Sequence, residues 1–93
     1  MSIGEIKMNI HIHRFFADSG HGWLEVPMDE LRTMGLIDSI SRYSYRSGNT
    51  AYLEEDCDAG LFITAKENLG MKVQLEEKHV DGDSFVRTLP RYY

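Results

Sequence analysis

The chain has 93 residues, 42% of them hydrophobic and 27% charged, and its 10 basic and 15 acidic side chains give a formal net charge of −5. These values are typical of one globular domain spanning residues 1–93. No apolar run approaches the roughly 20 residues that span a bilayer, and the N-terminal residues lack a signal-peptide layout. We therefore expect a cytoplasmic protein without membrane contact. The negative charge argues against direct binding of nucleic acid.

The first predicted element is a strand over Ile6–Phe16, where apolar and polar residues alternate. Successive side chains of a strand point to opposite faces, so the alternation predicts one buried row and one solvent row. The buried row would be Ile6, Met8, Ile10 and Ile12, and the solvent row would be Lys7, Asn9, His11 and His13. The two histidines would then lie on a free face of the sheet.

A turn is predicted over residues 18–22, because Gly20 and Gly22 flank a histidine and permit positive φ. Trp23–Val26 is predicted as a short return strand, with Leu24 buried and Trp23 outward. The two strands would form a hairpin.

A short helix is predicted after this hairpin. Pro27 suits its first position because proline has no backbone N–H and a preset φ, and Gly35 suits its end. Asp29 and Glu30 favour the positive N-terminal end of such a helix. Residues 36–41 are compatible with a further helical turn.

Tyr43–Tyr45 and Thr50–Glu54 are predicted to form a second hairpin around residues 47–49. In that register Tyr43 would lie opposite Tyr52, and aromatic cross-strand pairs of this kind contribute about 0.2–1 kcal/mol. The sequence leaves open whether this tyrosine face is buried, because the residues of the other parity are apolar as well.

The C-terminal part of the chain is predicted as a helix, a strand and a final edge strand. The helix would be capped by Asp56 or Asp58 and end at Leu69, and the edge strand would cover Phe85–Leu89 before Pro90. The buried stripe of the helix would be Leu61, Phe62, Ala65 and Leu69, and the buried row of the strand over residues 71–78 would be Met71, Val73 and Leu75.

Together these elements predict an α+β fold in the order β-β-α-β-β-α-β, with a sixth strand if the last segment pairs. Hairpins and short connections indicate a single, mainly antiparallel sheet of 5–6 strands. Because both helices are amphipathic and the strands are half-polar, we expect both helices on one face and the other face free.

Two surfaces are candidates for contact with a partner protein. Aromatic residues are enriched in interfaces, and an acidic run can bind a basic surface, although helix capping is its ordinary role. The first surface is the outward sheet face, with His11, His13 and Trp23 and, if they are exposed, Tyr43 and Tyr52. The second is the acidic run Glu54, Glu55, Asp56 and Asp58.

A metal protein or an enzyme is an alternative. His11 and His13, two residues apart on a strand, could reach one ion, and His21 could fold back as a third ligand. The sequence shows no catalytic set, and we expect no cofactor. Cys57 lies at a helix N-terminus, which lowers the pKa of a thiol, but the neighbouring carboxylates should outweigh this effect. We therefore expect a partly buried, inert thiol.

A resemblance rests on three stretches: Asp18–Pro27 (DSGHGWLEVP), Ile40–Tyr45 (ISRYSY) and Ala51–Asp58 (AYLEEDCD). They resemble a group of small uncharacterised proteins encoded by phages, plasmids and other mobile elements. A weaker match covers residues 81–85 and the tail, so the resemblance spans residues 11–93. The group brings no established activity, cofactor or catalytic residue. The resemblance implies an accessory protein of a mobile element that acts in the host cytosol.

By analogy, such a protein would inhibit host defence or nucleic-acid-handling machinery. The leading expectation is therefore a non-enzymatic protein that binds another protein. The alternatives are a small metal protein or enzyme built on His11, His13 and His21, and a structural or homodimeric subunit.

Overall fold

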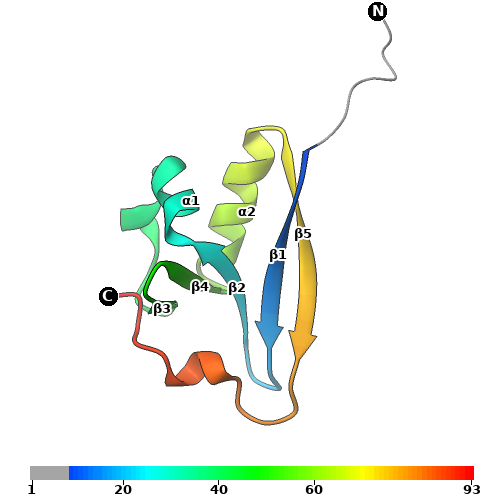
Figure 1. Cartoon of the computed structure of the whole chain (residues 1–93), viewed down its shortest axis with the longest axis vertical. Coiled ribbons are helices and arrows are strands. Elements are labelled where there is room, and N and C mark those ends of the chain that lie inside the picture. The colour runs from blue at the N-terminus through cyan, green and yellow to red at the C-terminus, as the bar shows by residue number, and fades with distance from the viewer. Residues whose placement is uncertain (1–8) are drawn as a thin grey trace, which may run out of the picture.

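The computed structural model describes residues 9–93, so the predicted positions of Ile6, Lys7 and Met8 lie outside the described residues. Seven helices and strands follow one another along the chain (Figure 1). They are β1 (Asn9–Ala17), β2 (Gly22–Pro27), α1 (Met28–Thr33), β3 (Tyr45–Ser47), β4 (Thr50–Glu54), α2 (Ala59–Asn68) and β5 (Met71–His79). Two short 3-10 helices, η2 (Ile37–Ser39) and η3 (Phe85–Thr88), complete the described part.

The strands form one five-stranded sheet in the order β3-β4-β2-β1-β5. Every pairing is antiparallel except that of β1 with β5, which is parallel. The sheet is therefore mixed but mostly antiparallel, and with α1 and α2 it makes the α+β fold that the sequence predicts. No helix within residues 9–93 is long and apolar enough to cross a membrane.

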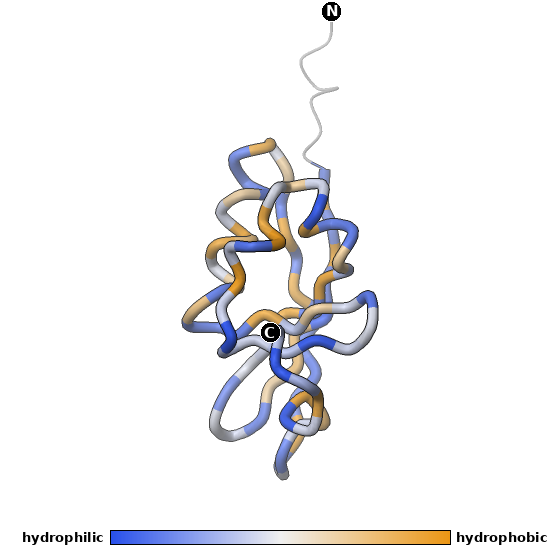
Figure 2. The backbone as a smooth tube through the Cα atoms, turned by 90° about the vertical axis from the view of Figure 1, so that its left-hand side faces the viewer, coloured by the Kyte–Doolittle hydropathy of each residue, from blue (hydrophilic) through white to orange (hydrophobic). Residues whose placement is uncertain are grey.

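The main core lies between α1, α2 and one face of the sheet. Leu24 of β2 pairs with Leu53 of β4, and both are fully buried beneath Leu31 of α1 and Phe62 of α2. Burying an aliphatic side chain of this size contributes roughly 2 kcal/mol before the loss of entropy is counted. Hydrophobic and hydrophilic stretches alternate at short intervals along the chain (Figure 2).

The predicted orientation of the first strand is wrong. Ile10 and Ile12 are 54% and 64% exposed, whereas His13 is only 7% exposed and His11 is half-buried. The reason is the register with β2: Phe15 pairs with Leu24, so Phe15 and the other odd-numbered residues of β1 face the helices.

A second cluster of buried residues lies on the opposite face of the sheet, at the end formed by β3, β4 and β2. Trp23, Tyr45 and Tyr52 pack there against Val86 of η3. The predicted outward exposure of Trp23 is therefore wrong. The predicted edge strand at residues 85–89 is also wrong, because these residues form η3 across that face and the tail makes only a single bridge, between Arg91 and Tyr45.

The second hairpin forms, but in a different register from the one predicted. Tyr45 pairs with Tyr52 and Ser47 pairs with Thr50, so Gly48 and Asn49 form a two-residue turn. Gly48 has a φ of 57°, a conformation that favours glycine. Tyr43 precedes β3 and is exposed, so it does not pair with Tyr52.

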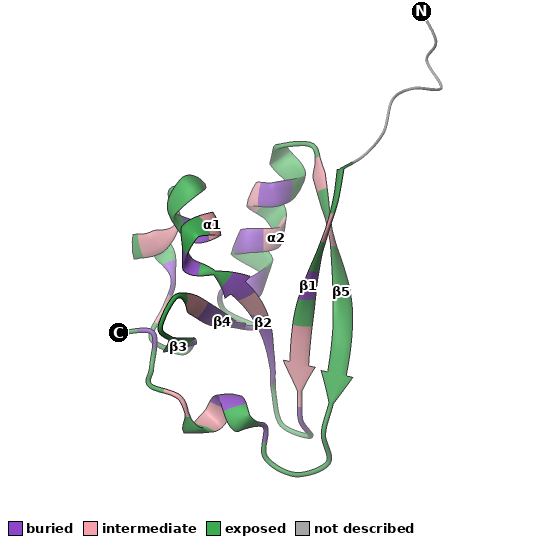
Figure 3. Cartoon of the chain, in the orientation of Figure 1, coloured by how far each residue is buried: buried purple, intermediate pink, exposed green. Residues whose placement is uncertain are grey.

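The helix α2 begins where the sequence predicts, but its buried stripe differs. Phe62 is buried, whereas Leu61 and Leu69 are exposed, and Lys66 takes the buried position one turn after Phe62. Met71 and Val73 are half-buried and Leu75 is exposed, because β5 is the edge of the sheet. The strand β5 is exposed along most of its length (Figure 3).

Asp58 precedes α2 but makes no side-chain cap to it. Its carboxylate instead accepts hydrogen bonds from the backbone N–H of Ser41 at 3.0 Å, from the Ser41 hydroxyl at 2.7 Å and from the Ser44 hydroxyl. Ser44 is fully buried, and its oxygen also accepts from the backbone N–H of Glu54 at 2.9 Å. These bonds connect the segment before β3 to both ends of the turn before α2.

Replacing Ser44 with alanine is expected to lower the free energy of unfolding by about 1–3 kcal/mol, because a buried carboxylate and a buried backbone N–H both lose a partner. Chemical denaturation of the variant measures this change. The exposed Ser47 offers the control, since Ser47→Ala should change stability by no more than about 0.5 kcal/mol. Equal stabilities of the two variants would contradict the role given to Ser44.

Candidate functional site

The two histidines of β1 belong to a polar network with α1 and α2. The Nε2 of His13 donates to Oε1 of Glu30 at 2.8 Å, and the ring of His13 meets Phe62 edge-on at 5.2 Å between centroids. Lys66, which is 2% exposed, makes an ion pair with the other oxygen of Glu30, and its Nζ lies 2.5 Å from Nδ1 of His11. We call His11, His13, Glu30 and Lys66 the polar network.

The charges of the polar network compensate one another. Burial alone would raise the pKa of Glu30, but hydrogen bonds and charge from His13 and Lys66 outweigh it, so this pKa is lowered. The carboxylate therefore stays ionised and balances the buried ammonium of Lys66. Neither Glu30 nor Lys66 is a site residue predicted from the sequence, although the four-residue spacing places Lys66 on the same face of α2 as Phe62.

Beside this network, β1 and β2 separate and leave a cleft of about 530 Å³. The two strands pair only from Phe15 to Ala17, and β2 then turns away into α1. The cleft is lined by His11, Ile12, His13, Arg14, Glu25, Pro27, Glu30 and Glu76. Arg14 and Glu25 form a bidentate pair across it, with N–O distances of 2.8 and 2.9 Å.

The side of β1 and β5 that faces away from the helices carries Ile10, Ile12 and Arg14, next to Lys72, Gln74 and Glu76. We call these six residues the open face. Neither helix covers it, and η3 packs on the other end of the same side, so all six are exposed.

The contact surfaces predicted from the sequence are only partly accessible. In the aromatic set, Trp23 and Tyr52 are buried under η3, and Tyr43 is exposed. In the acidic run, Glu54 and Asp58 are buried, and Glu55 and Asp56 are exposed. Because His13 is also buried, the predicted outward sheet face is corrected to the open face.

The structure does not bring the three histidines of the predicted metal site together. His11 and His13 bind Glu30 and Lys66, whereas His21, in the β1–β2 turn, lies with Glu54, Glu55 and Asp56. The thiol of Cys57 is exposed rather than partly buried. The carboxylate of Glu54, together with the nearby negative charges of Asp56 and Asp58, raises the pKa of this thiol, in the direction that the sequence predicts.

Comparison with models of protein families, with curated proteins and with solved structures finds no match to this chain.

Proposed function

We propose that this chain is a non-enzymatic protein-binding module, and that a strand of a partner protein pairs with the outer edge of β5 and covers the open face. The observation that supports this proposal is the contrast between the two edges of the sheet. On one edge, β3 has three residues, and the tail covers it through the bond from the Arg46 N–H to the Pro90 carbonyl at 2.9 Å. On the other, β5 has nine residues, and no strand within residues 9–93 pairs with its outer side.

A long free edge offers a row of backbone donors and acceptors to an incoming strand, which is a common mode of peptide recognition. The exposed Ile10 and Ile12 on the neighbouring strand supply apolar area beside it. The charges of Lys72, Glu76 and Lys78 oppose pairing with an arbitrary strand, so they favour a partner with complementary charges.

The resemblance to proteins of mobile elements makes a host protein the first class of partner to test. Within this proposal the protein acts in the host cytosol as an accessory factor that inhibits its partner. The single, exposed thiol of Cys57 suits a reducing compartment.

The proposal is tested by affinity capture from a lysate of the cell that carries the gene, comparing the native chain with the double variant Ile10→Asp and Ile12→Asp. Both positions are exposed, so the fold should tolerate the change, while a bound partner would have to bury two carboxylates. Leu69→Asp is the matched control, since Leu69 is equally exposed but belongs to the end of α2. A partner lost with the double variant and kept with Leu69→Asp supports the proposal. Equal capture by all three chains contradicts it.

A homodimer is a second candidate, because β5 is complementary to itself in one antiparallel register. With Gln74 on a two-fold axis perpendicular to the sheet, Lys72 lies opposite Glu76 of the second copy, and Val73 lies opposite Leu75. Moving the axis to Leu75 places Lys72 opposite Lys78, and moving it to Glu76 places that glutamate opposite itself. Both registers put like charges opposite one another, which is unfavourable.

Exchanging the charges of Lys72 and Glu76 distinguishes this homodimer from a monomer and from a dimer formed through another surface. Lys72→Glu alone and Glu76→Lys alone each place like charges opposite one another, so each should weaken the dimer, and the double variant should restore it. Light scattering coupled to size-exclusion chromatography measures the outcome. A native chain that stays monomeric at high concentration, or a dimer indifferent to all three variants, contradicts pairing through β5.

A further inference from the structure

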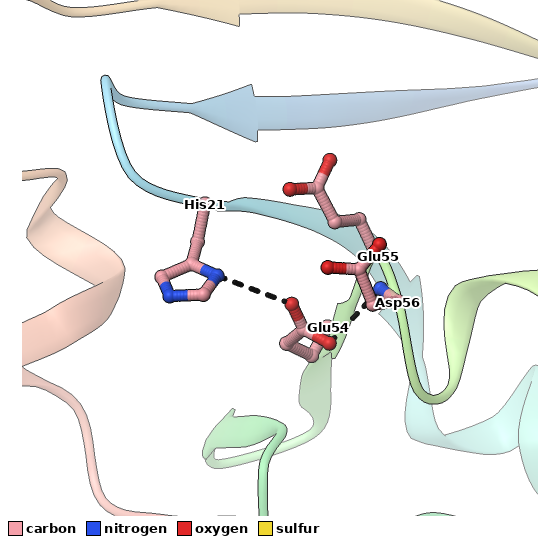
Figure 4. Close-up of side chains that lie close together, drawn as sticks. All are labelled: His21, Glu54, Glu55 and Asp56. Atoms are coloured by element: carbon pink, nitrogen blue, oxygen red, sulfur yellow. Dashed lines mark hydrogen bonds and ion pairs between the residues drawn. The ribbon is translucent and has the colours of Figure 1, made fainter.

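A cluster of metal-ligand side chains lies at the end of the sheet away from the polar network. His21 projects from the β1–β2 turn towards Glu54 at the end of β4, and Glu55 and Asp56 follow directly in the chain (Figure 4). One ligand atom from each of these four residues lies within 4.8 Å of the others. The backbone holds the two segments together, because Trp23 pairs with Glu54 and the Glu55 N–H donates to the Gly22 carbonyl at 2.9 Å.

The buried carboxylate of Glu54 distinguishes this cluster from an ordinary group of exposed acidic side chains. Glu54 is 7% exposed, and its Oε2 atom is buried with no hydrogen-bond partner among the described residues. Its other oxygen accepts from the Asp56 N–H at 2.9 Å, which fixes the carboxylate with Oε2 directed at His21. A buried carboxylate oxygen without a hydrogen bond costs free energy, and a bound cation would offset that cost.

We propose that His21, Glu54, Glu55 and Asp56 bind one divalent transition-metal ion of the zinc type. The Nδ1 atom of His21 lies 3.4 Å from Oε2 of Glu54, which is ion-pair distance for a protonated imidazole but is not a hydrogen bond (Figure 4). Two ligands at about 2.1 Å from a tetrahedral ion are about 3.4 Å apart. Glu55 and Asp56 are exposed, so their side chains are free to close the remaining distance.

The donor set selects the class of ion. One imidazole nitrogen and three carboxylate oxygens suit Zn²⁺, whereas Ca²⁺ takes 6–8 oxygen ligands and Mg²⁺ rarely accepts imidazole. His21, Glu54 and Asp56 line a surface hollow together with Arg87 and Arg91, but each arginine already has a partner. Arg87 donates to Asp18 at 2.6 and 2.9 Å, and Arg91 lies over the ring of Tyr45 at 4.6 Å.

This site differs from the open face, and it would connect the β1–β2 turn to the end of β4. Binding to the folded state alone raises thermal stability by mass action. The chain also carries its own reporter, because its single tryptophan, Trp23, lies with its ring centroid 6.1 Å from that of His21.

The test is a titration of the full chain with Zn²⁺ at pH 7, followed by calorimetry, by the thermal midpoint and by the fluorescence of Trp23. We expect one ion per chain, a higher midpoint and a saturable change in fluorescence. His21→Ala and Glu54→Gln should each weaken binding at least about tenfold, since loss of an outer-shell partner alone typically costs 10–100-fold. Glu54→Gln keeps the shape of the side chain and removes a buried charge, so without zinc it should be at least as stable as the native chain.

His79→Ala is the matched control, because His79 is an exposed histidine beside a carboxylate, with its Nε2 3.7 Å from Asp81. It should bind Zn²⁺ within twofold of the native chain. The proposal is overturned if the native chain binds no Zn²⁺, if His21→Ala and Glu54→Gln leave the affinity unchanged, or if His79→Ala lowers it as much as they do.

Discussion

Replacing Lys66 with methionine is expected to lower the free energy of unfolding by about 3 kcal/mol. Methionine nearly matches the length and shape of the lysine stem, so the loss comes from the charge rather than from a cavity. The variant leaves Glu30 without its buried cationic partner and leaves Nδ1 of His11 without the ammonium that lies 2.5 Å away. Chemical denaturation at neutral pH measures the change.

Two further variants test whether the loss comes from the ion pair of Lys66 with Glu30. Lys72→Met removes an exposed lysine of β5 and should change stability by no more than about 0.5 kcal/mol. Adding Glu30→Gln to Lys66→Met removes the unpaired charge, so the double variant should recover part of the loss and give a favourable coupling energy. A Lys66→Met variant as stable as the native chain would show that the network does not hold α2 against β1.

Replacing Asp18 with asparagine is expected to lower the thermal midpoint at neutral pH by at least about 5 °C. Asp18 closes the β1–β2 turn by accepting from the N–H groups of Gly20 and His21, and it holds η3 by accepting from Ser84 N–H at 3.0 Å and from Arg87. An amide has one acceptor oxygen instead of two charged ones, so it cannot satisfy these donors. The helix η3, which covers Trp23, should therefore pack less tightly on the sheet.

The same residue predicts how stability depends on pH. The Arg87 guanidinium and the surrounding N–H groups hold the pKa of Asp18 far below the ordinary value of an aspartate, about 3.9. Since the unfolded chain binds this proton first, the contribution of Asp18 is complete above about pH 5 and is lost as the pH falls below about 4. The Asp18→Asn variant should lack this part of the acid dependence, whereas Asp83→Asn, at an exposed position between β5 and η3, should keep it. Parallel pH curves for all three chains would contradict the assignment.

The sequence predicts the elements well wherever the signal is local. Turns or helix ends are marked by Gly20 and Gly22, by Gly48 and by Gly70. The alternation of apolar and polar residues over 71–78 marks β5. These signals suffice for the fold class, because hairpins and amphipathic helices leave few ways to cover one sheet.

The orientation of β1 could not be predicted in the same way, because both of its faces are plausible cores. Isoleucines on one row suggest burial, yet the row with His11 and His13 is inside. There His13 is hydrogen-bonded to Glu30, and His11 lies beside Lys66. Glu30 lies 17 positions from His13 and Lys66 lies 55 positions from His11, so no local pattern in β1 predicts these contacts. The cover over Trp23 depends in the same way on Asp18 and Arg87, which are 69 positions apart.

The candidate metal site shows the same division. His21 is a visible candidate in the sequence, but its predicted partners were the two histidines of β1. The pairing of β2 with β4 decides otherwise, because it places Glu54 beside Trp23 and so within reach of His21. In each case the missing information was a contact between residues far apart in the sequence.

Backbone amide exchange of the complex, measured residue by residue, tests the proposed binding face most directly. In the free chain, amides on the outer side of β5 should exchange quickly, because no described strand pairs with them. With the captured partner bound, the new protection should lie on β5 and on β1 around Ile10 and Ile12. New protection around Tyr43 and Asp56, with β5 unchanged, would contradict a binding face on β1 and β5.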